Sequence, residues 1–324
     1  MFEPILMRMI YLFVFILVGF ILSRWRFIPE NSAKVISKFE NMFFVPAMVL
    51  YTFLKDCSVA NLKASWQLIL LGTVVAFIFL LISYVAARFC FKENYVRKVA
   101  VYSIAFSNFA FMGYAIVASV FEEIYMQYIL FTLPLWFMIY LWGVPVLLIG
   151  TDGEGKGLLS RFKAFLNPMF IALIIGATLA LTGVAKYLPK VLFNPAKKDG
   201  ILDVANICMS PLAMILTGAT IGRLNLLHLI KKWRVYMISF IKLIIYPLLY
   251  IGVFAFVPQN SVINPTFLTC GMIFACMPTG LNSIVIPAAY DKDTSDAAGM
   301  ALVTHALSLA TIPLMFMLFE LFVL

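Results

Sequence analysis

The sequence predicts an all-α membrane protein of ten transmembrane helices, arranged as two inverted repeats of five helices. The chain is 64% hydrophobic and only 12% charged, with a mean hydropathy of +1.01, which is far more apolar than a soluble domain. Its apolar segments are long enough to cross a hydrocarbon core of ~30 Å as helices of ~20 residues. Similar polar motifs also recur in both halves of the chain.

Taken in order, the apolar segments differ mainly in the polar residues near their ends. The first is predicted to be an uncleaved helix, because Arg24-Trp25-Arg26 follows it and no small-residue cleavage site is present. The second and seventh are less clear, because Glu40 and Asp203 lie near their starts. We expect Glu40 to pair with a nearby lysine. The ten segments are residues 5–23, 35–54, 66–88, 98–120, 125–149, 167–184, 203–222, 234–257, 266–289 and 297–321.

The basic residues predict the orientation. With the N-terminus outside, 16 Lys and Arg residues face the cytoplasm and 7 face outward, and Lys242 lies within a span. This bias favours a multi-pass protein of the cell membrane with both termini extracellular. The exception is the 185–202 connection, which places four lysines outside. Cys57 should then react with an impermeant thiol reagent in intact cells, whereas Cys90 should not.

The same asymmetry accounts for the net charge of +9, so we expect the lipid bilayer as a partner and no nucleic acid. The five cysteines form no C-x-x-C pair, and His228 and His305 are the only histidines. Metal-ligand spacing and the common catalytic motifs are absent from the sequence. We therefore expect no metal, no cofactor and no enzymatic activity.

The chain is predicted to divide into two repeats, residues 1–150 and 166–324, joined by a cytoplasmic linker at 151–165. A polar, glycine-rich run from Gly150 to Gly157 marks the midpoint. Asn41 precedes Pro46 by five residues in the second segment, and Asn206 precedes Pro211 by five in the seventh. Five helices is an odd number, so the second copy enters the membrane from the opposite side, as in many secondary carriers.

The fourth and ninth segments each contain an asparagine at a predicted interruption. Asn108 lies in the run from Ser107 to Gly113, and Asn282 lies in the run from Met277 to Ser283. Proline and glycine weaken or remove helical hydrogen bonds, and the freed backbone groups need protein or water to satisfy them at membrane depth. A matched pair of interrupted segments is the best indication in a sequence of a transporter's substrate site.

These stretches resemble the auxin efflux carrier family. Cys276 to Tyr290 (CMPTGLNSIVIPAAY) is similar to its ninth helix and Val303 to Leu314 to its last, while Ser107 to Gly113 and Asn206 to Gly222 resemble the fourth and seventh. The resemblance implies a scaffold bundle and a transport bundle in which broken helices 4 and 9 cross. It also implies carriage of organic anions, such as auxin in plants and malate or malonate in bacteria, and the short linker resembles compact bacterial members.

One departure affects the fourth helix. The family often has a proline shortly after the glycine of that motif, whereas Tyr114-Ala115-Ile116 follows Gly113 here. The interruption of the fourth helix is therefore less secure than that of the ninth.

The candidate substrate-binding residues follow from the chemistry of an anion in a low-dielectric cavity, which needs donors and positive potential. Asparagine offers two N–H donors without a fixed charge, and a helix broken near Pro278 exposes unpaired N–H groups at the positive end of its dipole. Asparagine also joins helices together, and serine and threonine are common in close packing. The candidates are Asn108, Asn282, Pro278, Thr279, Gly280, Ser107, Ser283, Gly113, Asn41 and Lys242.

Two ionisable residues lie inside predicted spans. Lys242 is about 12 Å deep by helical rise, where it either faces a cavity and attracts anions or snorkels to the headgroups. His305 in the tenth span titrates near neutral pH and is the candidate for proton coupling. Its simpler interpretation is a neutral, hydrogen-bonded core histidine.

The sequence thus predicts a secondary transporter of a small mono- or dicarboxylate, such as malate, malonate or lactate, by alternating access around helices 4 and 9. One alternative is a sodium- or proton-coupled carrier like the bile-acid symporters, although segments 98–120 and 266–289 contain no Asp or Glu. Another is a membrane-embedded ligand sensor. The anion, the direction, the coupling and the oligomeric state are not readable from the sequence, and a homodimer is one option.

Overall fold

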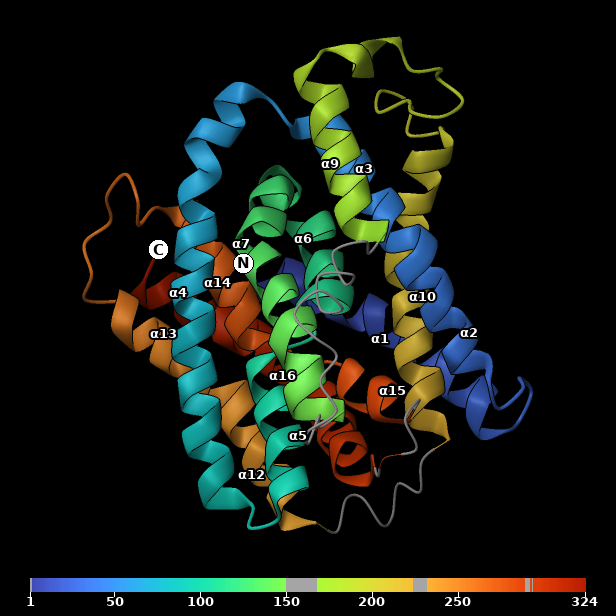
Figure 1. Ribbon diagram of the computed structural model, residues 1–324. Coiled ribbons are helices and arrows are strands. Elements are labelled where there is room, and N and C mark those ends of the chain that lie inside the picture. The colour runs from blue at the N-terminus through green and yellow to red at the C-terminus, as the bar shows by residue number, and fades with distance from the viewer. Residues whose placement is uncertain (1, 150–167, 224–231, 289–291, 293) are drawn as a thin grey trace.

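The computed structural model describes residues 2–149, 168–223, 232–288, 292 and 294–324. Within these residues every regular element is a helix (Figure 1), as the apolar segments predict. Extended backbone pairs at one isolated antiparallel bridge, between Ser107 and Thr279. The predicted linker at 151–165 lies outside the described residues.

Among the residues that the structure describes, six helices are long and apolar enough to cross a membrane, which agrees with a multi-pass protein. Three shorter apolar helices, Phe109–Val120, Pro168–Leu181 and Pro265–Cys276, fall within predicted spans. The total of ten spans stays a prediction. The six long helices are Phe2–Arg24, Val59–Cys90, Glu122–Leu148, Ile201–Gly222, Trp233–Phe254 and Ser295–Phe322.

In the first half of the chain, three predicted spans contain π-helical turns. Pro46 lies in the first turn of its helix, where a missing N–H costs least, and the turn before it widens into a π-helix. The elements are α1 (Phe2–Arg24), α2 (Ser32–Phe39), η1 (Glu40–Phe44), α3 (Val45–Asp56), α4 (Val59–Cys90), α5 (Asn94–Ala105), η2 (Phe109–Gly113), α6 (Tyr114–Val120), η3 (Glu122–Ile124), α7 (Tyr125–Met138) and η4 (Ile139–Ile149).

The second half has a π-helical turn in its eighth predicted span. Lys242 lies in a π-turn, and Pro247 follows it in the first turn of the next helix. The elements are α9 (Pro168–Leu181), η6 (Val184–Tyr187), α10 (Ile201–Gly222), α12 (Trp233–Phe240), η7 (Ile241–Ile245), α13 (Tyr246–Phe254), α14 (Pro265–Cys276), α15 (Asn282–Ala288) and α16 (Ser295–Phe322).

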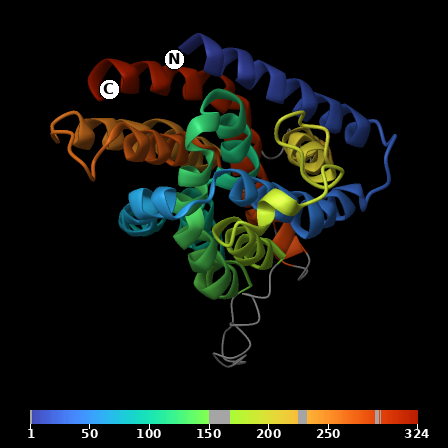
Figure 2. The ribbon, with the colours of Figure 1, turned by 90° about the horizontal axis from the view of Figure 1, so that it is seen from above.

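The helices pack in two groups. The first group consists of α1, α2, α3, α9 and α10, and the second contains α4 to α7 and α12 to α16. Helix α1 lies along α10 and also alongside α16, with both termini at the same end (Figure 2). Glycines bring α1 and α10 into close contact, because a Cβ atom at Gly218 or Gly19 would overlap the backbone of Ile16 or Ile215.

The prediction that Cys57 is accessible to an impermeant thiol reagent is wrong. Its side chain is only 7% exposed, and that of Cys90 is 5% exposed. Cys57 follows the last turn of α3, where its N–H donates to the Phe53 carbonyl, 3.0 Å away, and its side chain belongs to the hydrophobic core. Burial also raises the pKa of the Cys57 thiol, which lowers the fraction of reactive thiolate. Cys208 on α10 is exposed.

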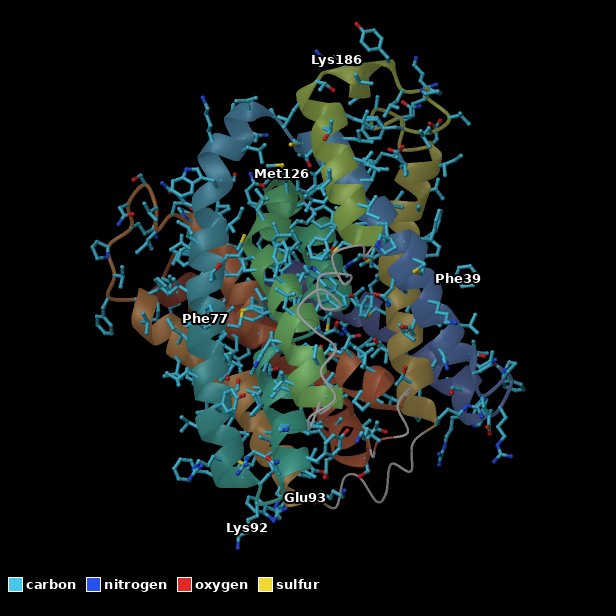
Figure 3. The ribbon with its side chains drawn as sticks, viewed as in Figure 1. Phe39, Phe77, Lys92, Glu93, Met126 and Lys186 are labelled. Carbon is cyan, nitrogen blue, oxygen red and sulfur yellow. The ribbon has the colours of Figure 1, made fainter. Side chains whose placement is uncertain are left out.

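Introduced cysteines provide a cleaner test of orientation. Lys186 and Lys92 are exposed at opposite ends of the molecule (Figure 3). In a Cys208→Ser background, we expect Lys186→Cys to react with an impermeant thiol reagent in intact cells. Lys92→Cys should react only after permeabilisation. The reverse pattern would contradict extracellular termini.

Candidate functional site

The two interrupted segments meet in the interior. Helix α5 ends at Ala105 and α14 ends at Cys276. The Asn108 N–H donates to the Pro278 carbonyl at 2.7 Å, and the Gly280 N–H donates to the Phe106 carbonyl at 3.2 Å. Each interruption thus satisfies backbone groups of the other, where neither has a helical partner. The fourth segment is interrupted without the family's usual proline.

Glycine is required at the point of closest approach. A Cβ atom on Gly280 would lie 2.8 Å from the Phe106 carbonyl oxygen, which is closer than real Cβ atoms come. Any larger residue would push the two segments apart and lengthen the hydrogen bonds between them. Gly113 plays a similar part beside Tyr128, whose hydroxyl donates to the Phe109 carbonyl at 3.2 Å.

Two side chains bind the carbonyl end of α14. The Ser107 hydroxyl donates to the Phe274 carbonyl at 3.0 Å, and the Lys242 ammonium donates to the Ala275 carbonyl at 3.4 Å. These carbonyls end a helix, so they lack helical donors and form the negative end of the dipole. A hydroxyl and a cation therefore stabilise the end of α14.

Lys242 does not snorkel toward the headgroups. Its side chain is 0% exposed, and its ammonium lies 4.9 Å from the ring centre of Tyr246 and 5.5 Å from that of Phe274. Aromatic faces attract cations through their quadrupoles. The nitrogen thus lies among aromatic rings and beside the Ala275 carbonyl.

Thr279 is fixed by Thr304 of α16, a contact that sequence reasoning missed. The Thr304 hydroxyl donates to the Met300 carbonyl at 2.7 Å, which leaves its oxygen free to accept. It accepts from the Thr279 hydroxyl at 3.0 Å and from the Thr279 N–H at 3.3 Å. The signal was present, because Thr304 stands beside His305 in the stretch that resembles the family's last helix.

Asn108 is joined to His305. The Asn108 amide nitrogen lies 3.1 Å from His305 Nε2, and His305 Nδ1 lies 2.8 Å from the Ala301 carbonyl. A carbonyl only accepts, so Nδ1 carries the proton and Nε2 accepts from the amide. The neutral tautomer of His305 therefore suits this geometry, and the histidine positions Asn108.

Asn282 lies beside the point where the two segments meet. It is the first residue of α15 and lines a small cavity with Tyr102 and Asn108. That cavity has a volume of about 20 Å³, close to the minimum for one water molecule. The Ser283 hydroxyl caps its own turn by donating to the Gly280 carbonyl at 2.7 Å.

The structure does not place Asn41 with these residues. Its side-chain amide donates to the Ser37 carbonyl of its own helix at 2.8 Å. Its counterpart Asn206 lines a different and larger cavity, together with Pro211. The Asn-x-x-x-x-Pro motif of the second half therefore lies beside a polar space, whereas the side-chain amide of the first-half motif bonds locally.

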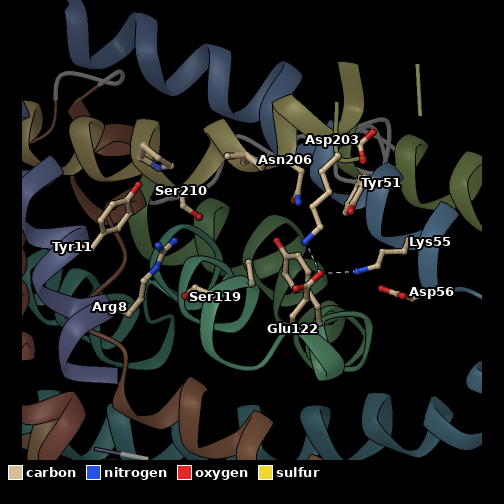
Figure 4. Close-up of a pocket in the computed structure, with 15 residues that line it drawn as sticks. Arg8, Tyr11, Tyr51, Lys55, Asp56, Ser119, Glu122, Asp203, Asn206 and Ser210 are labelled. Atoms are coloured by element: carbon tan, nitrogen blue, oxygen red, sulfur yellow. Dashed lines mark hydrogen bonds and ion pairs between the residues drawn. The ribbon is translucent and has the colours of Figure 1, made fainter. Parts of the chain in front are cut away.

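This larger space, here called the interface cavity, lies between the two helix groups (Figure 4) and has a volume of about 240 Å³. Glu122 lies between two cations, with its carboxylate oxygen 2.7 Å from the Lys55 ammonium and 3.7 Å from that of Lys198. The other polar residues that line the interface cavity include Arg8, Tyr11, Tyr51, Asp56, Ser119, Asp203, Asn206 and Ser210. Charged residues of both signs make it suited to polar or ionic solutes.

The prediction that Glu40 pairs with a nearby lysine is wrong. The side chain is 0% exposed, and neither carboxyl oxygen has a hydrogen-bond partner. The nearby lysines Lys34 and Lys38 are exposed. The π-turn that begins at Glu40 rotates the following residues relative to an α-helix, and the sequence pattern did not predict it.

Comparison with known proteins gives one family. The model of a family described as membrane transport protein matches residues 4–158 and 157–316. The two matched segments meet near the polar midpoint of the chain and together cover nearly all of it. No curated protein matches the chain significantly.

Replacing Thr304 tests the support of the interrupted segment. Thr304→Val keeps the shape but removes the oxygen that accepts from Thr279, so we expect a loss of about 1–3 kcal/mol for an unpaired buried donor. Thr178→Val is the matched control, because Thr178 bonds the Ile174 carbonyl of its own helix and is exposed. Thermal unfolding in detergent measures both variants, and equal melting temperatures for both would contradict the role of Thr304.

Proposed function

Because this chain belongs to the membrane transport protein family, which is the auxin efflux carrier family that its motifs resemble, we propose that it is a secondary transporter of a small organic anion. The observation that carries the proposal is the pairing of two interrupted helices through Asn108, Pro278 and Gly280. Transporters bind substrates where discontinuous helices place their ends near the middle of the membrane.

The chemistry at this contact favours an anion. Asn108 precedes η2 and Asn282 begins α15, so both stand at helix starts, where the helix dipole attracts negative charge. The spans 98–120 and 266–289 contain no Asp or Glu that would hold a cation. A mono- or dicarboxylate such as malate, malonate or lactate has the oxygens to accept from both asparagine amides.

The geometry also supports alternating access. Pockets for small molecules have volumes of about 300–1,000 Å³, whereas the cavity beside Asn108 and Asn282 holds about 20 Å³. A substrate therefore enters only if the helices around this cavity move apart. The interface cavity already lies between the two helix groups, and we propose that it is the entrance from the side of the membrane to which it opens. In this proposal the first group is the scaffold and the second group is the transport bundle.

Lys242 adds positive potential in this proposal. Its charge is buried beside the Ala275 carbonyl at the end of α14, two residues before the interruption that begins at Met277. A buried charge is screened little by salt, in contrast to exposed charges beyond a Debye length of about 8 Å. Its effect on a bound anion should therefore persist at high ionic strength.

A carboxylate screen tests the proposed substrate class. We expect malate, malonate or lactate at 100 times its dissociation constant to stabilise the purified protein by about 2.7 kcal/mol, seen as a higher melting temperature. Asn108→Ala and Asn282→Ala should each abolish this shift and the uptake of the same anion into proteoliposomes. Asn31→Ala is the control, because Asn31 is exposed and its side chain caps nothing.

The outcome that contradicts the proposal is specific. If both asparagine variants bind and transport at the parent level, the site lies elsewhere and the two amides serve packing. If no carboxylate shifts the melting temperature of the parent, the substrate is not of this class.

Substitution of Lys242 separates charge from packing. Lys242→Met removes the ammonium but keeps the apolar stem, so we expect a much weaker affinity for the anion than in Lys242→Arg, at both low and high salt. Isothermal titration with the anion found in the screen measures both dissociation constants. Equal constants for the parent and Lys242→Met would leave the lysine a purely structural role at the end of α14.

A further inference from the structure

Tyr102 of α5 carries a buried hydroxyl group without a hydrogen-bond partner among the described residues. Its side chain is 1% exposed, and its hydroxyl oxygen is enclosed by the protein. Buried polar groups in native proteins are almost always hydrogen-bonded, so an exception needs an explanation. Tyr102 also lines the small cavity beside Asn108 and Asn282, which places this hydroxyl at the candidate substrate site.

Most of the other polar side chains on the wall of this cavity already have partners. The indole N–H of Trp136 and the hydroxyl of Ser107 donate to groups of the protein, and the amide of Asn108 has a partner on α16. Asn282 is partly exposed. It lies near the Tyr102 hydroxyl but forms no hydrogen bond of normal geometry with it. The Tyr102 hydroxyl is therefore a polar group of the wall that remains available to a ligand.

The tyrosine ring is held in place by its surroundings. Tyr102 lies in the last turn of α5, where its carbonyl accepts from the Phe106 N–H at 2.9 Å. The centres of these two rings are 4.9 Å apart. Gly143 makes room for both rings, because a Cβ atom there would lie 2.8 Å from the Phe106 ring and 3.3 Å from the Tyr102 ring. A ligand that reaches the hydroxyl thus meets a donor that is already fixed in position.

The position of Tyr102 in the chain keeps its hydroxyl with the substrate site. Tyr102 and Asn108 are six residues apart in the same predicted span, and both line the cavity. The cavity must enlarge to admit an anion. Because the two residues belong to one short segment, the hydroxyl accompanies the Asn108 amide when helices around the cavity move apart.

The chemistry of the wall indicates what the hydroxyl can recognise. Its described lining residues include no Asp, Glu, Lys or Arg, so neutral groups make the direct contacts with a solute. The two asparagine amides suit one carboxylate. A tyrosine hydroxyl both donates and accepts, so it suits a second carboxylate or a hydroxyl of the same molecule. A simple monocarboxylate has only an alkyl group to place there, which would leave the tyrosine hydroxyl unpaired.

We propose that Tyr102 binds the second oxygen-bearing group of the anion and thereby selects hydroxy acids and dicarboxylates over simple monocarboxylates. This inference rests on the proposed transport function, to which it adds a specificity-determining residue.

Three acids of equal carbon number test the selection. Lactate, malonate and propionate each have three carbons, and they differ in whether the second group is a hydroxyl, a carboxylate or absent. We expect the parent protein to bind lactate, malonate or both more tightly than propionate, measured by isothermal titration in detergent. Tyr102→Phe should raise the dissociation constant by about tenfold for lactate and by about 10- to 100-fold for malonate. The dissociation constant for propionate should stay unchanged.

The melting temperature of the unliganded protein separates binding from packing. The Tyr102 hydroxyl has no partner, so Tyr102→Phe should melt at the parent temperature or above it. Tyr250→Phe is the matched control. Tyr250 is also buried, but its hydroxyl donates to the Leu268 carbonyl at 3.1 Å, and it lines a separate apolar cavity. This control should melt at a lower temperature and keep the parent's preference among the three acids.

The outcomes distinguish this proposal from the proposed function. Equal weakening of all three acids in Tyr102→Phe, or a melting temperature as low as that of Tyr250→Phe, would show a structural role and overturn the proposal. If Asn108→Ala and Asn282→Ala abolish binding while Tyr102→Phe keeps the parent's preference, only the role of Tyr102 fails. A parent that binds none of the three acids would contradict both proposals.

Discussion

The backbone pairing between the two interrupted helices is the constraint on which the rest of the structure depends. A chain that leaves the helical conformation inside an apolar interior exposes N–H and C=O groups that no lipid can satisfy. Here the segment around Ser107 and the segment around Thr279 pair as an antiparallel bridge, so each provides the partners that the other lacks. Neither interruption is stable without the other, and this dependence fixes the two halves of the chain against each other.

Side chains from other helices make this pairing specific. Thr304 and His305, which are adjacent on α16, bond Thr279 and Asn108, and Lys242 bonds the end of α14. Because these polar groups are buried, each one lost leaves another unsatisfied, which costs more than an exposed hydrogen bond. The same network both holds the interruption in place and presents amide groups at the positive ends of two helices.

The two cavities differ greatly in size. The space beside Asn108 and Asn282 holds about 20 Å³, while the interface cavity holds about 240 Å³. Glu122 joins Lys55 of the first group across that cavity, and this pair is partly exposed, so it contributes little stability.

The sequence by itself determined the features that depend on local composition: the helical segments, the midpoint of the chain, the family and the positions of the two interruptions. Hydrophobicity and the residues Pro278 and Gly280 act within a few positions of themselves, so a linear pattern is enough to reveal them. The tertiary structure decided which groups become partners. Asn108 and His305 are 197 residues apart, and Cys57 and Glu40 proved buried where the pattern predicted a reactive thiol and an ion pair. Burial and pairing depend on distant helices and on a π-turn that shifts the side of a helix facing the core, and no periodicity in the sequence contains that information.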